Sequence, residues 1–135
     1  MKKLLIIIIF FSNTVFAEVI NIGNEELKIL LKQGIPIVDV RNKNEWEATG
    51  TISMSHLISM LNHNGKYSIE NWYNEFSKMK LKNNSVILIC AVGGRSHYLA
   101  KIINHHKKNI KVYNVKKGIK NWIKYNNPVV QYNNN

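Results

Sequence analysis

The chain has 135 residues, with 19 lysines and arginines against 8 acidic residues and a formal net charge of +11. A chain of this length forms one domain with a hydrophobic core and is too short for two. A basic balance can indicate a nucleic-acid partner, but these lysines are spread along the chain and many stand beside asparagines. We interpret the charge as a solvated basic surface, without a nucleic-acid site, that attracts small anions.

The first 17 residues predict a secretory signal peptide. A basic start at residues 1–3 is followed by eight apolar residues (4–11) and by the compact segment Val15-Phe16-Ala17, which is the order found in such leaders. A transmembrane helix needs roughly 20 apolar residues, and residues 12–14 are polar. We expect cleavage after Ala17, export to the periplasm, and a mature domain over residues 18–135 without a membrane anchor. A buried amino-terminal strand is the alternative interpretation of the apolar run.

Beyond this leader, strand-like and helix-like patterns alternate. Compact apolar runs predict strands at residues 19–22, 35–40, 85–89 and 112–115. Helical spacing predicts helices at residues 25–32, 44–48, 68–79, 96–105 and 119–125. The first helix is expected to have Asn24 as its cap and Gly34 at its end. A short extended piece is expected after residues 50–52, and a loose tail from residue 131 onward.

This alternation predicts an α/β fold, with a central parallel sheet and helices on both faces. The aromatic stripe within residues 68–79 has helical spacing, so we expect it in the core rather than around a cofactor. In folds of this kind, ligands bind beyond the carboxyl ends of the strands. Residues that directly follow a buried strand are therefore the candidates for a functional site.

Cys90 is the only cysteine and directly follows the most apolar strand, residues 85–89. A small exported protein usually pairs its cysteines, so this one is either a buried filler or a reactive thiol. The loop Ala91-Val92-Gly93-Gly94-Arg95-Ser96 comes next and opens a helix. Its glycines allow successive amides to point inward as an anion-binding nest. The helix start adds partial positive charge, so we expect a lowered pKa for the Cys90 thiol and a cradle for a persulfide or oxyanion.

The segment C-A-V-G-G-R-S at residues 90–96 resembles the active-site loop C-x-x-G-x-R-S of the rhodanese family of sulfurtransferases. Three further segments are similar to family patterns: the strand ending in Asp39 and Arg41 with E-W at 45–46 and Gly50, the G-I-K-N-W run ending at Trp122, and P-V at 128–129. The resemblance covers residues 19–130. The sequence departs from the family where Thr51 replaces a histidine, where S-M-S-H at 53–56 replaces P-G-A-x, and where Lys117 replaces a glycine.

The resemblance implies a rhodanese-like domain that moves a sulfane sulfur from a small anionic donor such as thiosulfate to a thiol or cyanide, through a persulfide on Cys90. It implies that the amides from Ala91 to Ser96 hold the sulfur anion and that Arg95 ties the loop to the scaffold, with Asp39 as the expected partner. Asp39 and Arg41 are expected to support the site, and Arg41 and His56 to lie near its mouth. No cofactor is implied, and the five histidines show no metal-ligand spacing.

Two alternatives remain open at this point. Related folds act as phosphatases or arsenate reductases with a C-x5-R loop, whereas four residues separate Cys90 from Arg95. The shorter loop favours a sulfur atom over a tetrahedral oxyanion, and no acidic residue stands in place as a leaving-group acid. The other alternative is a carrier module that delivers the persulfide to a dedicated protein partner, because only the acceptor differs.

Overall fold

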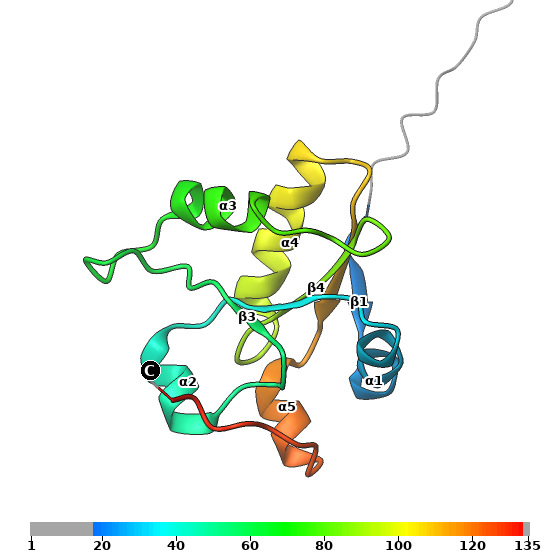
Figure 1. Ribbon diagram of the computed structural model, residues 1–135, viewed down its shortest axis with the longest axis vertical. Helices are drawn as coiled ribbons and strands as arrows, with labels where there is room; N and C mark the ends of the chain where they lie inside the picture. Colours follow the sequence, from blue (N-terminus) through cyan, green and yellow to red (C-terminus); the bar gives the residue numbers. More distant parts are fainter. Residues whose placement is uncertain (1–17, 134–135) are drawn as a thin grey trace, which may run out of the picture.

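The computed structural model describes residues 18–133 and shows a parallel sheet of five strands between helices (Figure 1). The order in the sheet is β1-β5-β4-β2-β3. The strands are β1 (Ile20–Ile22), β2 (Ile37–Asp39), β3 (His56–Leu57), β4 (Ser85–Ile89) and β5 (Lys111–Val115). The α/β fold expected from the sequence is confirmed. The predicted signal peptide, residues 1–17, lies outside the described residues.

Helices cover both faces of the sheet. They are α1 (Asn24–Lys32), α2 (Lys43–Thr49), α3 (Ile69–Ser77), α4 (Gly94–His106) and α5 (Gly118–Lys124). In Figure 1, α3 and α4 lie on one side of the strands, and α1 and α5 lie on the other. No helix within residues 18–133 combines the length and the apolar character needed to cross a membrane.

The central strand β4 is buried on both faces. Val86, Leu88 and Cys90 belong to the apolar cluster that packs toward α3 and α4, whereas Ile87 and Ile89 belong to the cluster on the α1 and α5 side. This alternation follows from the two-residue period of a strand. Because two packed layers hold β4, the position of Cys90 at its carboxyl end is fixed from both sides.

The aromatic stripe of α3 lies in the core, as its spacing predicts. The rings of Trp72 and Phe76 are both buried and stack with centroids 5.3 Å apart. The indole N–H of Trp72 donates to the carbonyl of Ile58 at 2.9 Å, so its one polar atom is satisfied. Ser68 precedes the helix, and its hydroxyl accepts the Asn71 N–H, which ties the start of α3 to a specific residue.

Most element boundaries differ from the sequence expectation by one or two residues, and two of these differences have a clear cause. Gly23, rather than Asn24, precedes α1, and its N–H donates to the Glu26 carboxylate at 3.2 Å. Strand β2 begins at Ile37 instead of Ile35. The reason is that the Ile35 N–H donates to the Leu30 carbonyl at 3.1 Å and so completes the end of α1.

The chain after α5 returns to the body of the domain. Thr51 and Val130 exchange two backbone hydrogen bonds of 2.9 and 2.7 Å, and the Tyr132 ring lies 5.6 Å from the Trp46 ring. Gly50 permits this approach, since a Cβ there would lie 2.6 Å from the Val130 carbonyl oxygen. The loose tail expected from residue 131 is therefore wrong as far as Tyr132, because an aromatic ring gives the segment a packing partner.

Candidate active site

Cys90 lies directly after β4, between the carboxyl ends of β2 and β5. The loop that follows turns at Gly93, which has φ 99°, and α4 begins at Gly94. A Cβ at Gly93 would lie 2.0 Å from the carbonyl oxygen of Lys116, so a side chain has no room there. Gly94 has open space around it. Of the two glycines, only Gly93 is required by the geometry of the loop.

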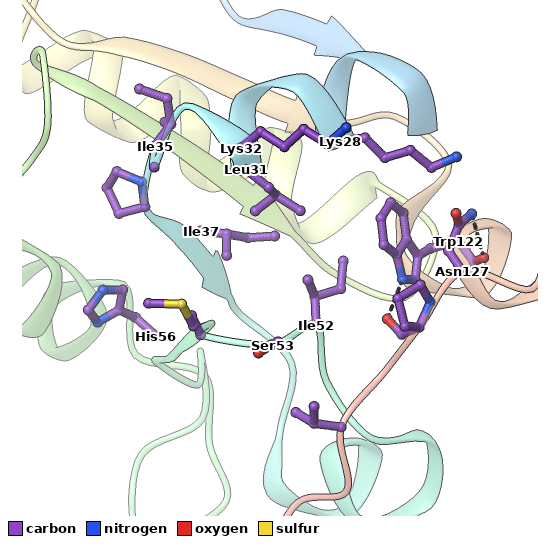
Figure 2. Close-up of a pocket in the computed structure, with 15 residues that line it drawn as sticks. Lys28, Leu31, Lys32, Ile35, Ile37, Ile52, Ser53, His56, Trp122 and Asn127 are labelled. Atoms are coloured by element: carbon purple, nitrogen blue, oxygen red, sulfur yellow. Dashed lines mark hydrogen bonds between the residues drawn. The ribbon is translucent and has the colours of Figure 1, made fainter.

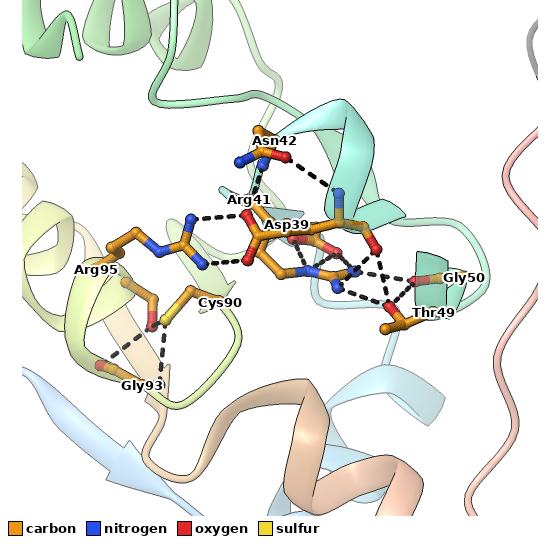
Figure 3. Close-up of polar contacts among 10 residues, drawn as sticks. Asp39, Arg41, Asn42, Thr49, Gly50, Cys90, Gly93 and Arg95 are labelled. Atoms are coloured by element: carbon orange, nitrogen blue, oxygen red, sulfur yellow. Dashed lines mark hydrogen bonds and ion pairs between the residues drawn. The ribbon is translucent and has the colours of Figure 1, made fainter. Parts of the chain in front are cut away.

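The sulfur of Cys90 receives hydrogen bonds from its own loop (Figure 3). The Gly93 N–H lies 3.1 Å from Sγ, and the Ser96 hydroxyl oxygen lies 3.3 Å from it. Burial opposes ionisation of the thiol, but the Ser96 hydroxyl and the amides of Ser96, Gly93 and Val92 stabilise the anion more strongly, so the pKa of Cys90 lies below its ordinary value. The shift has the direction expected for a reactive thiol.

The start of α5 holds the loop through backbone hydrogen bonds. Ile119 N–H donates to the Cys90 carbonyl at 2.9 Å, and Lys120 N–H donates to the Ala91 carbonyl at 3.1 Å. Gly118 has φ 64°, and a Cβ there would lie 2.3 Å from the Ala91 carbonyl oxygen. Lys117 has φ −103°, a conformation that any residue adopts. The replacement of the family's first glycine by Lys117 therefore leaves the loop backbone intact.

Access to the sulfur is narrow. Cys90 is 1% exposed, whereas Val92 on the same loop is 63% exposed. The Val92 side chain therefore lies on the surface while the sulfur sits beneath the loop. A reactant that meets Sγ must present a slim terminal atom, and the outer sulfur of a small donor has this shape.

Arg95 joins the loop to α2. Its guanidinium donates two parallel hydrogen bonds to the Glu45 carboxylate, at 2.8 and 2.6 Å. The expected pairing of Arg95 with Asp39 is wrong, because Asp39 already has another partner. Hydrogen bonds from Arg95 hold the pKa of Glu45 below its usual range, against the opposing effect of burial. Glu45 also raises the pKa of Arg95, so both groups stay charged at neutral pH.

Sequence reasoning missed Glu45 as a partner of the loop, although a signal was present. Asn42 and Glu45 form a capping box at the start of α2, in which each side chain accepts the other's backbone N–H at 3.1 Å. Asn-x-x-Glu ahead of a helix is the sequence signature of this motif. The box fixes the Glu45 carboxylate at the helix start, where Arg95 reaches it.

Asp39 and Arg41 form a buried pair behind this contact (Figure 3). They are 0% and 1% exposed, and Arg41 donates to Asp39 at 2.7 and 2.9 Å. The remaining guanidinium donors bind the Thr49 hydroxyl at 2.8 Å and the Gly50 carbonyl at 2.9 Å. Arg41 therefore does not lie at the mouth of the site as expected. These contacts hold the end of α2, and Arg41 also donates to the Glu45 carbonyl at 3.3 Å, so its support of the loop is indirect.

His56 also lies away from the sulfur. It lines an apolar hollow of about 540 Å³, on the side of the sheet that α1 and α5 flank. Figure 2 shows Leu31, Ile37 and Ile52 facing this hollow, with His56 at its border. Cys90 is not among its lining residues, so the expectation that His56 borders the active site is wrong.

A series of hydrogen-bonded polar side chains, which sequence reasoning missed, begins at Ser96, next to the sulfur; we call it the polar chain. The Ser96 hydroxyl lies 2.6 Å from Asn114 Oδ1, and Asn114 Nδ2 donates to Asn21 Oδ1 at 2.9 Å. The available signal was one polar residue inside the apolar strand β5. Within residues 18–133, no three or more histidine, cysteine, aspartate or glutamate side chains are grouped as metal ligands.

Comparisons with known proteins agree with this geometry. The model of the Rhodanese-like domain family matches residues 23–125, and no curated protein matches the chain. Similar solved structures include a rhodanese-related protein from Thermoplasma volcanium, with 23% identity over 84% of this chain and 99% of that one and a TM-score of 0.66. Another is the polysulfide-sulfur transferase homodimer from Wolinella succinogenes, with 18% identity over 87% and 82% of the two chains and a TM-score of 0.64.

A third similar structure is a protein of unknown function from Rhodopseudomonas palustris, described as a possible tyrosine phosphatase. It has 21% identity over 83% of this chain and 85% of that one, with a TM-score of 0.62. At such identities these structures show a shared fold. The family model extends over most of the described domain, including β2, β4 and the loop from Cys90 to Ser96. The chain therefore belongs to the Rhodanese-like domain family.

Proposed function

We propose that this protein transfers a sulfane sulfur from an anionic donor such as thiosulfate to a thiol or cyanide, through a persulfide on Cys90. The observation that carries the proposal is the loop around the one cysteine. Its sulfur is held by the Gly93 N–H and the Ser96 hydroxyl, and its pKa is lowered despite burial. A thiolate is the form of cysteine that acts as a nucleophile.

The reaction proceeds in two displacements. The Cys90 thiolate attacks the outer sulfur of thiosulfate, the donor's S–S bond breaks, and sulfite leaves with that electron pair. The enzyme then carries a Cys90 persulfide with the negative charge on its terminal sulfur. Cyanide or a thiolate attacks this terminal sulfur, the persulfide bond breaks, and the Cys90 thiolate is restored. Such a covalent intermediate divides one transfer into two steps and gives ping-pong kinetics.

The same chemistry serves a protein acceptor, and we include a partner protein with a reactive thiol among the acceptors. The proposed site of action is the periplasm, on the basis of the leader at residues 1–17. The phosphatase alternative has weaker support. Only four residues separate Cys90 from Arg95, and the Arg95 guanidinium donates two hydrogen bonds to Glu45 rather than being directed at a phosphate.

Mass spectrometry of the purified protein tests the proposal directly. After incubation with thiosulfate, the peptide that contains Cys90 should gain the mass of one sulfur atom, and cyanide should remove it with release of thiocyanate. The C90S variant should gain nothing while keeping its melting temperature within a few degrees, since the change is mild in size. Transfer by C90S, or an unmodified Cys90 that hydrolyses p-nitrophenyl phosphate, would refute sulfur transfer through this residue.

A further inference from the structure

The Ser96 hydroxyl has three acceptors around it and one hydrogen to give. Its oxygen lies 2.6 Å from Asn114 Oδ1, 3.3 Å from the Gly93 carbonyl oxygen and 3.3 Å from the Cys90 sulfur. Two oxygen atoms at 2.6 Å require a hydrogen between them, so in this arrangement the hydroxyl donates to Asn114. The sulfur then faces the lone pairs of Ser96, an arrangement that suits a neutral thiol donating its own hydrogen.

A thiolate needs the opposite arrangement. It has no hydrogen, so the Ser96 hydroxyl must turn toward the sulfur to stabilise the charge. Asn114 Oδ1 then loses its donor, and Asn114 is only 2% exposed and Ser96 fully buried. A buried oxygen without a hydrogen-bond donor destabilises the folded protein. While the hydroxyl hydrogen lies on Asn114 Oδ1, the polar chain therefore does not stabilise the thiolate, and the sulfur gains the Ser96 hydrogen bond only when the Asn114 amide turns.

Rotation of the Asn114 amide removes this conflict. A half-turn exchanges its oxygen and nitrogen without moving the rest of the side chain. Nδ2 then donates to the Ser96 oxygen, and the hydroxyl hydrogen is free to point at the sulfur. The Asn114 oxygen now faces Asn21, which must turn as well and donate through its own Nδ2. Asn21 is exposed on β1, so water satisfies whichever end of its amide points outward.

We propose that Asn114 is a positioning residue for Cys90, whose amide, backed by Asn21, sets whether the Ser96 hydroxyl accepts from the thiol or donates to the thiolate. When the thiol ionises, its proton leaves to water and the two amides turn together. The inference rests on the proposed function in one respect, that Cys90 reacts as a thiolate. It assigns a role in the site to a residue on β5 and to an exposed residue on β1, neither of which contacts the sulfur.

The N21D variant tests this series of hydrogen bonds, from Asn21 through Asn114 to Ser96, which we call the relay. Asn21 is its exposed end, where a substitution is least harmful to folding. A carboxylate only accepts hydrogen bonds, so it fixes Asn114 with Nδ2 toward β1 and Oδ1 toward Ser96. The hydroxyl hydrogen then stays away from the sulfur. The rate of Cys90 alkylation by iodoacetamide at pH 7 should fall by about fivefold or more, and the midpoint of its pH profile should move upward.

Two controls separate this relay from a simple effect of added charge. N109D adds the same charge at an exposed position just before β5. This position is at the amino-terminal end of the strands, whereas Cys90 is at their carboxyl end, so N109D should leave the pH profile of alkylation unchanged. In the S96A background, N21D should also have no effect, because the hydroxyl that transmits it is gone. This double-mutant cycle isolates the coupling between the two residues.

Three results would overturn the inference: an unchanged profile in N21D, an equal shift by N21D with and without Ser96, or a shift of the same size in N109D. The buried variant N114D provides a second measurement and should shift the midpoint at least as far as N21D in the wild-type background. Alkylation reports ionisation of the thiol and not sulfur transfer. If N21D shifts the alkylation profile only when Ser96 is present, but thiosulfate leaves no persulfide on Cys90, the proposed function is refuted and the inference about Asn114 is not.

Discussion

The sulfur of Cys90 is stabilised as an anion by hydrogen bonds that the unfolded chain does not make. Its folded pKa is therefore below the ordinary thiol value. Between these two values the unfolded state still binds a proton that the folded state has lost, so the free energy of unfolding rises with pH. The contribution is complete above the ordinary thiol pKa and disappears as the pH falls through the folded value.

This increase of the free energy of unfolding with pH should differ between the wild type and C90S. Urea unfolding of both proteins at a series of pH values should show that the stability advantage of the wild type grows as the pH rises through that interval. All other ionisable groups are the same in both proteins, so the difference between the two isolates the thiol. A difference that stays constant with pH would mean that the loop does not stabilise the thiolate.

The two glycines of the loop make a matched pair of substitutions. G93A places a methyl group 2.0 Å from the Lys116 carbonyl oxygen at φ 99°, so we expect a loss of roughly 2 kcal/mol or more together with the loss of sulfur transfer. G94A meets open space at the first residue of α4 and should retain activity, with stability unchanged or raised by up to about 1 kcal/mol. Thermal melts and transfer assays distinguish these outcomes, and equal behaviour of the two variants would contradict the geometry.

At this scale, the sequence predicted residues that act through local geometry and missed those that act across the fold. Cys90, Gly93 and Ser96 lie within residues 90–96, which form the loop and the first turn of α4, so their order along the chain already brings them together. Glu45 and Asn114 reach the same loop from α2 and β5, and their contacts depend on how these elements pack. The incorrect pairing of Arg95 with Asp39 has the same origin, because a nearby arginine two residues along the chain binds Asp39 first.

At the scale of elements, the Arg95–Glu45 contact connects the first turn of α4 to the start of α2. Both side chains are partly buried, at 27% and 29% exposed, and the two hydrogen bonds require the forked guanidinium. R95A should lower stability by about 1 kcal/mol and should also reduce transfer, because the loop loses its connection to α2. R95K keeps the charge without the fork and should recover only part of both properties.

The exposed pair between Lys78 and Glu75 gives the control for this experiment. Both side chains are more than half exposed, so K78A should change stability little. Melting temperature and transfer rate should be measured for R95A, R95K and K78A together. If R95K matches the wild type in both, charge alone explains the contact, and the fork has no role in holding the loop.

The order of helices and strands could be predicted from periodicity, whereas their ends could not. Ile35 is as apolar as its neighbours in β2, yet its N–H completes α1, and only the packed structure decides between these partners. The tail gives a second case: a polar composition suggests a loose end, but Tyr132 packs on Trp46. The composition of a segment does not show which single residue, here Tyr132, will find a packing partner.

At the scale of the whole molecule, the charge is unbalanced near the active loop. Outside the predicted signal peptide (residues 1–17), the sequence has 17 basic residues and 8 acidic ones, a formal charge of +9. Lys116, Lys117 and Lys120 are exposed on the segment that supports the loop through the Ala91 and Cys90 carbonyls. A positive surface beside a narrow site raises the local concentration of anions.

We therefore expect kcat/KM for thiosulfate, which carries two negative charges, to fall as salt increases, since charge effects are screened within about 8–10 Å at 0.10–0.15 M ionic strength. Methanethiosulfonate carries one charge and should show a weaker dependence. K117E should reduce kcat/KM for thiosulfate at low salt by roughly two- to fivefold and flatten the salt dependence. K32E, on α1 beside the hollow of Figure 2, carries the same change in net charge away from the loop. If K32E and K117E have equal effects, only the net charge of the molecule matters, and Lys117 has no special part in attracting the donor.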